Sequence, residues 1–234
     1  MASTNIKLTK DELKNEIELY LYDFKRIHDS FEIYKGIKKS ASEYSKEINS
    51  ISQLIVPILG SLQYTFLIGL AKMLLEDEDK NIQNLLTLCG YNKDVFPTEH
   101  RRQYLDDEGK IIIPPDIEKV NIQEDIKNIR IQLKIYKQAI NNLDTIRNKF
   151  LAHSDEEYYN NVSRLFKENT ITYAEVEKLI KIIKDSLNTL IKDLADTTWI
   201  FTKEGVEDFT YICKALKENK EMHIKRLKGG KNNE

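Results

Sequence analysis

Apolar residues recur every three or four positions along most of this chain, a spacing that predicts amphipathic α-helices. The first stripe lies within about residues 9–35, and Thr9 and Glu12 form the capping box that opens it. Further helices are predicted over about residues 41–77, 81–88, 121–153, 172–197 and 202–227. The pattern favours an all-α fold, an antiparallel helical bundle, with one domain over residues 1–228 and a disordered tail at 229–234.

The second predicted helix, residues 41–77, contains the most hydrophobic stretch of the chain. We expect Pro57 to kink this long helix, because proline removes a hydrogen-bond donor and clashes with the preceding turn. The stretch approaches the length of a membrane span, but Pro57, Gly60 and Lys72 are among the residues that interrupt it. We therefore expect a buried core helix and no membrane association.

The helical rhythm breaks over residues 91–120, just after a short helix that is expected to end near Gly90. The turn residues 106–109 separate two apolar segments, which predicts a small β-hairpin or an irregular flap. Such an insertion either gates a cleft or is a tolerated excursion. His100 within it is expected to be an exposed loop histidine.

Two strongly polar residues, Arg147 and His153, fall on an apolar face. If residues 136–154 form one α-helix, its apolar side chains share an arc roughly 160° wide that includes both. In one interpretation, Arg147 pairs with a carboxylate inside the bundle, Glu76 or Asp77, and His153 bonds a carbonyl near the helix end. In the other, both residues lie in a polar cleft, and a two-fold axis between two copies gathers two such pairs in one groove.

The second interpretation implies phosphate chemistry. An arginine fork suits phosphate oxygens, and histidine has the unperturbed pKa nearest neutrality. In RNA the 2′-hydroxyl can attack the adjacent phosphorus, with His153 as base or acid and a twin histidine in the other role. Arg147 would offset the charge on the phosphorane. DNA lacks this nucleophile and should not be cleaved.

Residues 146–155, Ile-Arg-Asn-Lys-Phe-Leu-Ala-His-Ser-Asp, resemble the signature of HEPN-domain proteins. With the apolar helix at residues 62–77 ahead of them, they are similar to the abortive-infection U-type (AbiU2-like) branch in particular. This resemblance implies an all-helical HEPN-like domain that commonly dimerises and often acts as a metal-independent endoribonuclease in phage-defence or toxin systems. It also implies that Arg147 binds the scissile phosphate, His153 transfers protons and Asn148 assists them.

Inactive relatives of this kind exist, so a non-catalytic helical interaction module is the second functional hypothesis. In either case a neutralising antitoxin or another defence partner is expected from the resemblance. Some relatives carry a His-x-Tyr sequence whose tyrosine a partner nucleotidyltransferase modifies. Here Ser154 and Asp155 follow the histidine, which disfavours that pairing.

Composition limits where RNA could bind. With 36 basic and 38 acidic residues the net charge is −2, so any RNA contact must come from local patches. Lys149, Arg101 and Arg102 are the candidate substrate-binding residues, and the basic tail at 225–231 is a further patch. Charge runs of this kind are more often only solvated surface.

The remaining chemistry suggests no cofactor. The acidic run 76–79 is more often solvated than metal-binding, and we predict no metal site. Cys89 and Cys213 have no metal-ligand spacing, and the first residues lack the apolar core of a signal peptide. These features predict a cytoplasmic protein.

Overall fold

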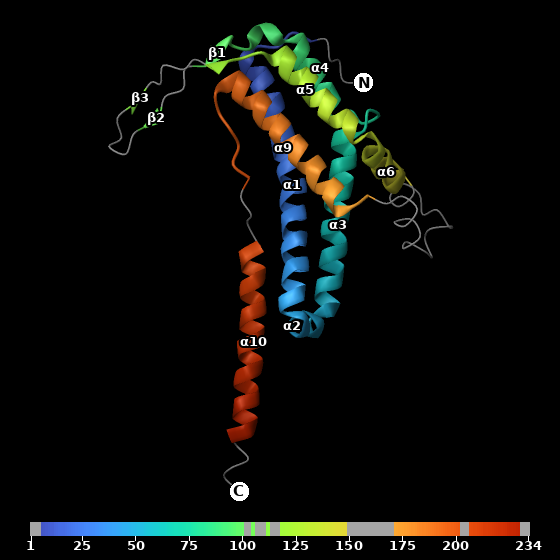
Figure 1. The fold of residues 1–234 in the computed structure, drawn as a ribbon, viewed down its shortest axis with the longest axis vertical. Helices are drawn as coiled ribbons and strands as arrows, with labels where there is room; N and C mark the ends of the chain where they lie inside the picture. Colours follow the sequence, from blue (N-terminus) through green and yellow to red (C-terminus); the bar gives the residue numbers. More distant parts are fainter. Residues whose placement is uncertain are drawn as a thin grey trace. The chain divides into compact units, whose positions relative to one another are not determined.

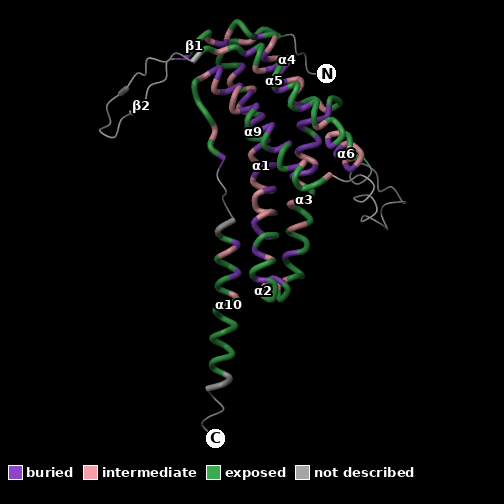
Figure 2. The backbone as a smooth tube through the Cα atoms, in the orientation of Figure 1, coloured by how far each residue is buried: buried purple, intermediate pink, exposed green. Residues whose placement is uncertain are grey.

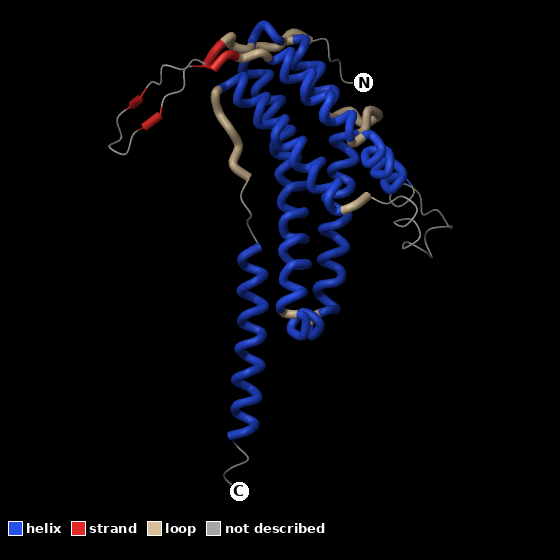
Figure 3. Tube along the Cα trace, viewed as in Figure 1, coloured by secondary structure: helices blue, strands red, loops and turns tan. Residues whose placement is uncertain are grey.

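Helices dominate the computed structural model (Figure 1, Figure 3), and the prediction of an all-α helical bundle is confirmed. The structure describes residues 6–100, 104–105, 111–112, 118–148, 171–201 and 206–229. Their helices are α1 (Lys10–Glu43), α2 (Ser45–Ser50), α3 (Ser52–Leu74), α4 (Ile82–Tyr91), α5 (Ile122–Ile135), α6 (Lys137–Arg147), α9 (Tyr173–Ala195) and α10 (Val206–Gly229).

The chain divides into two compact units. Unit 1 comprises Met1–Lys25 and Leu67–Ile200, and unit 2 comprises Arg26–Phe66 and Phe201–Glu234. Helices α1 and α3 supply residues to both units. A single domain over residues 1–228 therefore stays a prediction, and the expected tail at 229–234 lies outside the described residues apart from Gly229.

In unit 1, α5 packs against α4 and α9. The helices of unit 1 begin where the sequence predicts, because Thr9, Asn81, Asn121 and Thr172 each accept a hydrogen bond from a backbone N–H of the first turn. The largest wholly buried side chains of this unit are Leu13, Ile17, Leu21, Phe24, Leu70, Ile82, Leu85, Leu86, Leu143 and Ile146. Figure 2 shows the buried stripes along these helices.

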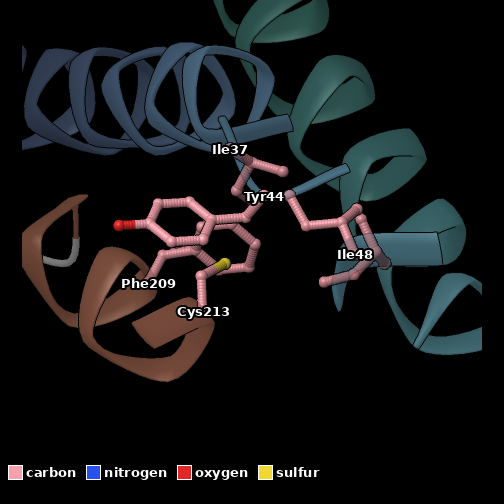
Figure 4. Close-up of a cluster of buried hydrophobic side chains, with 6 residues drawn as sticks. Ile37, Tyr44, Ile48, Phe209 and Cys213 are labelled. Atoms are coloured by element: carbon pink, nitrogen blue, oxygen red, sulfur yellow. The ribbon is translucent and has the colours of Figure 1, made fainter. Parts of the chain in front are cut away.

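The core of unit 2 includes a cluster in which α10 packs against α2. Figure 4 shows Phe209 and Cys213 of α10 facing Ile37, Tyr44 and Ile48. Beyond Cys213, none of residues 214–226 is buried (Figure 2). The cluster therefore secures only the first part of α10.

The predicted helix over residues 41–77, kinked at Pro57, is wrong in its boundaries. Helix α1 continues to Glu43, and breaks at Tyr44 and Ile51 separate it from α2 and α3. Tyr44 at the first break, Ile48 between the two breaks and Ile55 beyond the second all belong to one buried cluster. Pro57 lies inside α3, near its start, where the missing N–H leaves only one carbonyl without its helical donor.

Helix α3 differs from the predicted buried core helix in its first half. Its mean hydropathy of 1.8 and its length would suit a membrane span, yet only 28% of the apolar window is buried. Leu54 and Val56 are 60% and 66% exposed, whereas Phe66, Leu70 and Leu74 are buried. The reason is that the cluster of unit 2 contacts a single face of the first half, at Ile55 and its neighbours.

The insertion at residues 91–120 contains the predicted hairpin. Strand β2 (Tyr104–Leu105) pairs antiparallel with β3 (Ile111–Ile112), and β1 (Glu99–His100) pairs antiparallel with β4 (Glu118–Lys119). Gly90 does not end α4, which continues to Tyr91 before Asn92 closes it.

Candidate functional site

The segment that carries Arg147 is two helices rather than the predicted single one of residues 121–153. Helix α5 ends at Ile135, and the N–H of Tyr136 bonds the carbonyl of Leu133 at 3.1 Å, a tight turn that separates α5 from α6. Arg147 is the last residue of α6. Its orientation is therefore set by α6 and by what α6 packs against.

The apolar face of α6 is already buried within one copy of the chain. Ala139, Leu143 and Ile146 are each at most 2% exposed. Leu143 and Ile146 therefore serve the core of unit 1. The two-fold axis that would bring two Arg147–His153 pairs into one groove stays a prediction, as does dimerisation.

The guanidinium of Arg147 donates to three carboxylates. One terminal nitrogen, Nη2, lies 2.7 Å from Oδ2 of Asp77 and 3.0 Å from Oδ1 of Asp144. The other, Nη1, lies 2.5 Å from Oε1 of Glu78. The ion pair with Asp77 that the first interpretation predicted is present, and Glu76, the alternative, is not among these partners.

Two asparagines fix the loop that presents the carboxylates of residues 77 and 78. Asn81 is wholly buried, accepts from the N–H of Asn84 at 2.9 Å and donates to the carbonyl of Glu78. The side chain of Asn84 donates to the carbonyl of Asp79 at 3.0 Å. The acidic loop is thus tied to the first turn of α4, which holds it against the end of α6.

The side chain of Asn148 contacts that of Arg147 directly. Its Oδ1 accepts from Nε of Arg147 at 3.2 Å, and its Nδ2 donates to Oδ1 of Asp144 at 2.9 Å. The amide therefore joins the guanidinium to one of its carboxylates.

Arg147 and Asp77 each favour the charged form of the other. The hydrogen bond from Arg147 holds the pKa of the Asp77 carboxyl below its ordinary value of 3.8, and the same bond raises the pKa of Arg147. One guanidinium and three carboxylates leave the cluster with a formal charge of −2. A phosphate that binds Arg147 must therefore displace at least one carboxylate.

A groove of about 480 Å³ adjoins the cluster and shares Asp77 and Asp144 with it. Its other charged walls are Glu76 of the acidic loop and the cations Arg130, Lys134 and Lys137 of α5 and α6. The sequence reasoning missed these cations. Their spacing of three and four residues was the signal that could have revealed them.

The other predicted site residues, His153, Lys149, Arg101 and Arg102, lie outside the described residues. Glu78 and Asp144 are partners of Arg147 that the sequence reasoning did not identify. Of the two, Asp144 could have been predicted more easily from the sequence, because it lies one helical turn before Arg147. Within the described part of the chain, no three His, Cys, Asp or Glu side chains form a cluster suited to a metal ion.

Two histidines, His28 and His100, are buried. Nε2 of His100 lies 2.9 Å from the carbonyl of Asp193 and donates to it. His28 lies beside Asp29, with its ring 5.2 Å from that of Phe201. The prediction that His100 is exposed was wrong, because the packing that buries its ring comes from residues distant in sequence.

The chain was also compared with known proteins. The family model for the AbiU2 HEPN proteins matches residues 10–203, a range that includes all the residues of the Arg147 cluster and His153. Comparisons with curated proteins and with solved structures found no significant match. Because the family match covers most of the 234 residues, the chain belongs to the AbiU2 family of HEPN proteins.

Proposed function

We propose that this protein is a metal-independent endoribonuclease that serves a phage-defence or toxin-type system. The observation that carries the proposal is the pairing of Arg147 with Asn148 at the end of α6, in a chain of the HEPN family. Arg147 binds the scissile phosphate, and Asn148 orients the guanidinium. His153, six residues further along the sequence, moves the protons.

The proposed reaction uses the substrate's own nucleophile. The ribose 2′-oxygen loses its proton to a histidine and forms a bond to phosphorus, while the bond to the 5′-oxygen breaks and that oxygen gains a proton. The products are a 2′,3′-cyclic phosphate and a 5′-hydroxyl. If two copies of the chain share the site, His153 of each supplies one of the two proton transfers.

Because three carboxylates surround Arg147, a substrate phosphate must replace at least one of them when it binds. A phosphodiester oxygen accepts from the same fork that now donates to Asp77, Glu78 and Asp144. Binding of phosphate at Arg147 therefore competes with the acidic loop. The observed cluster is, on this proposal, the resting arrangement of the site.

The same contacts favour a second candidate function, a non-catalytic interaction module. An arginine that is 14% exposed and paired with three carboxylates is fully satisfied as a structural residue. In that case Arg147 serves to attach the acidic loop to α6. The functional surface then binds a protein partner, such as a neutralising antitoxin or another defence component.

Cleavage of total RNA in the presence of a chelator tests the proposal. We expect the wild type to cleave and His153→Ala to lose about 10²–10⁴-fold in rate, the usual contribution of general acid–base catalysis. Mass spectrometry of the new ends should find 2′,3′-cyclic phosphate, and DNA of matched sequence should stay intact. Light scattering at micromolar concentration tests the two-copy site, since a monomer that cleaves excludes it.

A variant that neutralises the acidic loop separates the two candidate functions. Asp77→Asn with Glu78→Gln removes two competitors for the guanidinium, so cleavage should rise several-fold if Arg147 binds phosphate. Arg147→Ala, with its fold checked by circular dichroism, should abolish cleavage. RNA left intact by the wild type and by the loop variant would instead favour the interaction module.

A further inference from the structure

A row of cations runs along one face of α5 and into α6. Lys127, Arg130, Lys134 and Lys137 recur at intervals of three and four residues, which places them on the same side of the helix. All four side chains are exposed. The break at Tyr136 does not divide the row, because Lys134 and Lys137 line the same groove. We call these four residues the α5 basic row.

The α5 basic row is not neutralised by carboxylates of the described residues. Arg130 donates to the hydroxyl of Thr87 at 3.0 Å, and no described carboxylate forms an ion pair with any of the four cations. Arg147 differs sharply, since three carboxylates surround it. In a chain whose net charge is −2, uncompensated cations on one face form a local positive surface.

Two adjoining grooves follow the α5 basic row. One, of about 330 Å³, is lined by Ile126, Lys127, Arg130, Ile131 and Lys134 with Gln123, and no carboxylate lines it. The other is the groove beside Arg147 described above, and the two share Arg130 and Lys134. A ligand bound along the row therefore approaches the carboxylates of Asp77 and Asp144, where Arg147 is held.

We infer that the α5 basic row binds the phosphate backbone of single-stranded RNA and directs it to Arg147. This inference rests on the proposed function, because an RNA substrate must reach that arginine. Lys127 and Lys137 are ten residues apart, roughly 15 Å along a helix, or on the order of four stacked nucleotides. Ile131, which is exposed and lines the same groove as Lys127 and Arg130, offers apolar surface to unstacked bases.

The chemistry of the row suits a polyanion better than an isolated phosphate. Each cation supplies a point charge to a backbone oxygen without reading sequence. The carboxylates near Arg147 repel a polyanion. Most of the affinity should therefore come from Lys127 and Arg130, at the other end of the row, where no carboxylate lines the groove. Binding along the row then raises the local concentration of phosphate at Arg147, which favours the exchange with Asp77 and Glu78.

Binding of an uncleavable RNA tests the row independently of catalysis. A fluorescent 2′-O-methyl oligoribonucleotide of about 12 nucleotides spans the row and lacks the free 2′-hydroxyl needed for cleavage. Fluorescence anisotropy over a salt series gives its affinity for the full chain. Replacing Lys127, Arg130, Lys134 and Lys137 by glutamine should weaken binding at low salt at least about tenfold and lower the salt slope by roughly 3.

A matched control removes exposed lysines from the same unit at another groove. Lys178→Gln with Lys181→Gln on α9 should bind within about twofold of wild type. Equal binding by the row variant and the wild type would overturn the inference, as would absence of wild-type binding. The assignment to RNA would be overturned if the wild type bound an acidic peptide more tightly than it binds the RNA and if the row variant lost that peptide binding.

The result is separable from the proposed function. Row-dependent RNA binding by a protein that never cleaves RNA would support the row and reject the ribonuclease. If the wild type cleaves RNA but the row variant binds the uncleavable RNA as well as the wild type does, the ribonuclease is supported and the role of the row is rejected. The row residues are exposed, so these substitutions should leave the circular dichroism spectrum unchanged.

Discussion

Arg147 shows how much of one residue's chemistry depends on its neighbours. The sequence places a cation on an apolar face, and a buried charge must find a partner. The structure supplies three carboxylates from two places, Asp144 on the same helix and the loop at residues 77 and 78. The guanidinium is therefore already occupied, and under the proposed function a phosphate reaches it only by displacing one of these carboxylates.

The pKa of Asp77 makes this attachment sensitive to acid. Its folded pKa lies below the ordinary value of 3.8, so the carboxylate stabilises the fold above that pH and this contribution is lost as the pH falls through the folded pKa. Asp77→Asn should lower the free energy of unfolding by less than about 1 kcal/mol at neutral pH, because the carboxylate is largely exposed. The difference from wild type should shrink as the pH falls below 3.8.

Urea unfolding of both proteins from neutral pH to about pH 3 measures this difference. Asp185→Asn, which removes an exposed carboxylate of α9 outside the Arg147 cluster, is the control and should stay near the wild type. A difference between wild type and Asp77→Asn that grows on acidification would contradict the assignment. So would an Asp77→Asn protein more stable than the wild type at neutral pH.

At the residue scale, local rules predicted part of the site. One interpretation expected Arg147 to pair with Glu76 or Asp77, because a polar residue on an apolar arc requires a partner, and the structure shows the pair with Asp77. Glu78 was missed, since which side chain of an acidic run reaches inward depends on how Asn81 ties down the loop. The burial of His28 and His100 was missed for a similar reason, since it comes from contacts distant in sequence.

At the element scale, the starts of helices were predicted well and the breaks poorly. Capping residues such as Thr9 and Thr172 act through side-chain bonds to their own first turn, so the local sequence is sufficient. The breaks at Tyr44, Ile51 and Tyr136 involve neither proline nor glycine. None of the three breaks is therefore marked by a helix-breaking residue, and the local sequence reads as continuous helix across each of them.

Gly90 offers a test of where α4 ends. It lies inside α4, and a Cβ there would meet Cδ1 of Ile126 at 3.6 Å, an ordinary contact. Gly90→Ala should therefore raise the free energy of unfolding by about 0.5–1 kcal/mol, because alanine favours the helix.

Thermal unfolding checks this expectation, with Gly60→Ala in α3 as the companion. A Cβ at Gly60 meets nothing within 4 Å, so this variant reports the helix preference without packing. Stabilisation at Gly60 combined with loss of stability at Gly90 would show that α4 and α5 pack too closely for a methyl group.

At the scale of the whole molecule, each compact unit contains one cysteine. Cys89 lies in unit 1 and Cys213 in unit 2, and both are wholly buried. Burial raises the pKa of the Cys89 thiol to about 12 and also raises the pKa of Cys213. Neither thiol should react in the folded state, so each reports the opening of its own unit.

We expect Cys213 to react with a thiol reagent at least about tenfold faster than Cys89. The reason is that Phe209 and Cys213 are the α10 residues in the unit 2 cluster, so release of one short segment exposes this thiol. Cys89→Ser and Cys213→Ser variants, labelled separately below the unfolding transition, measure the two rates. Equal rates for the two single-cysteine proteins would show that both thiols become exposed in one cooperative opening.

The uncovered part of α10 has a consequence for how it behaves in solution. From residue 214 to residue 226 no side chain is buried, so this stretch gains little from packing and is helical mainly through its own backbone bonds. Helices of fewer than about 12–15 residues are marginal in water without packing. The stretch should therefore exist in a helix–coil equilibrium, whose position shifts with temperature and ionic strength while the rest of the fold is unchanged.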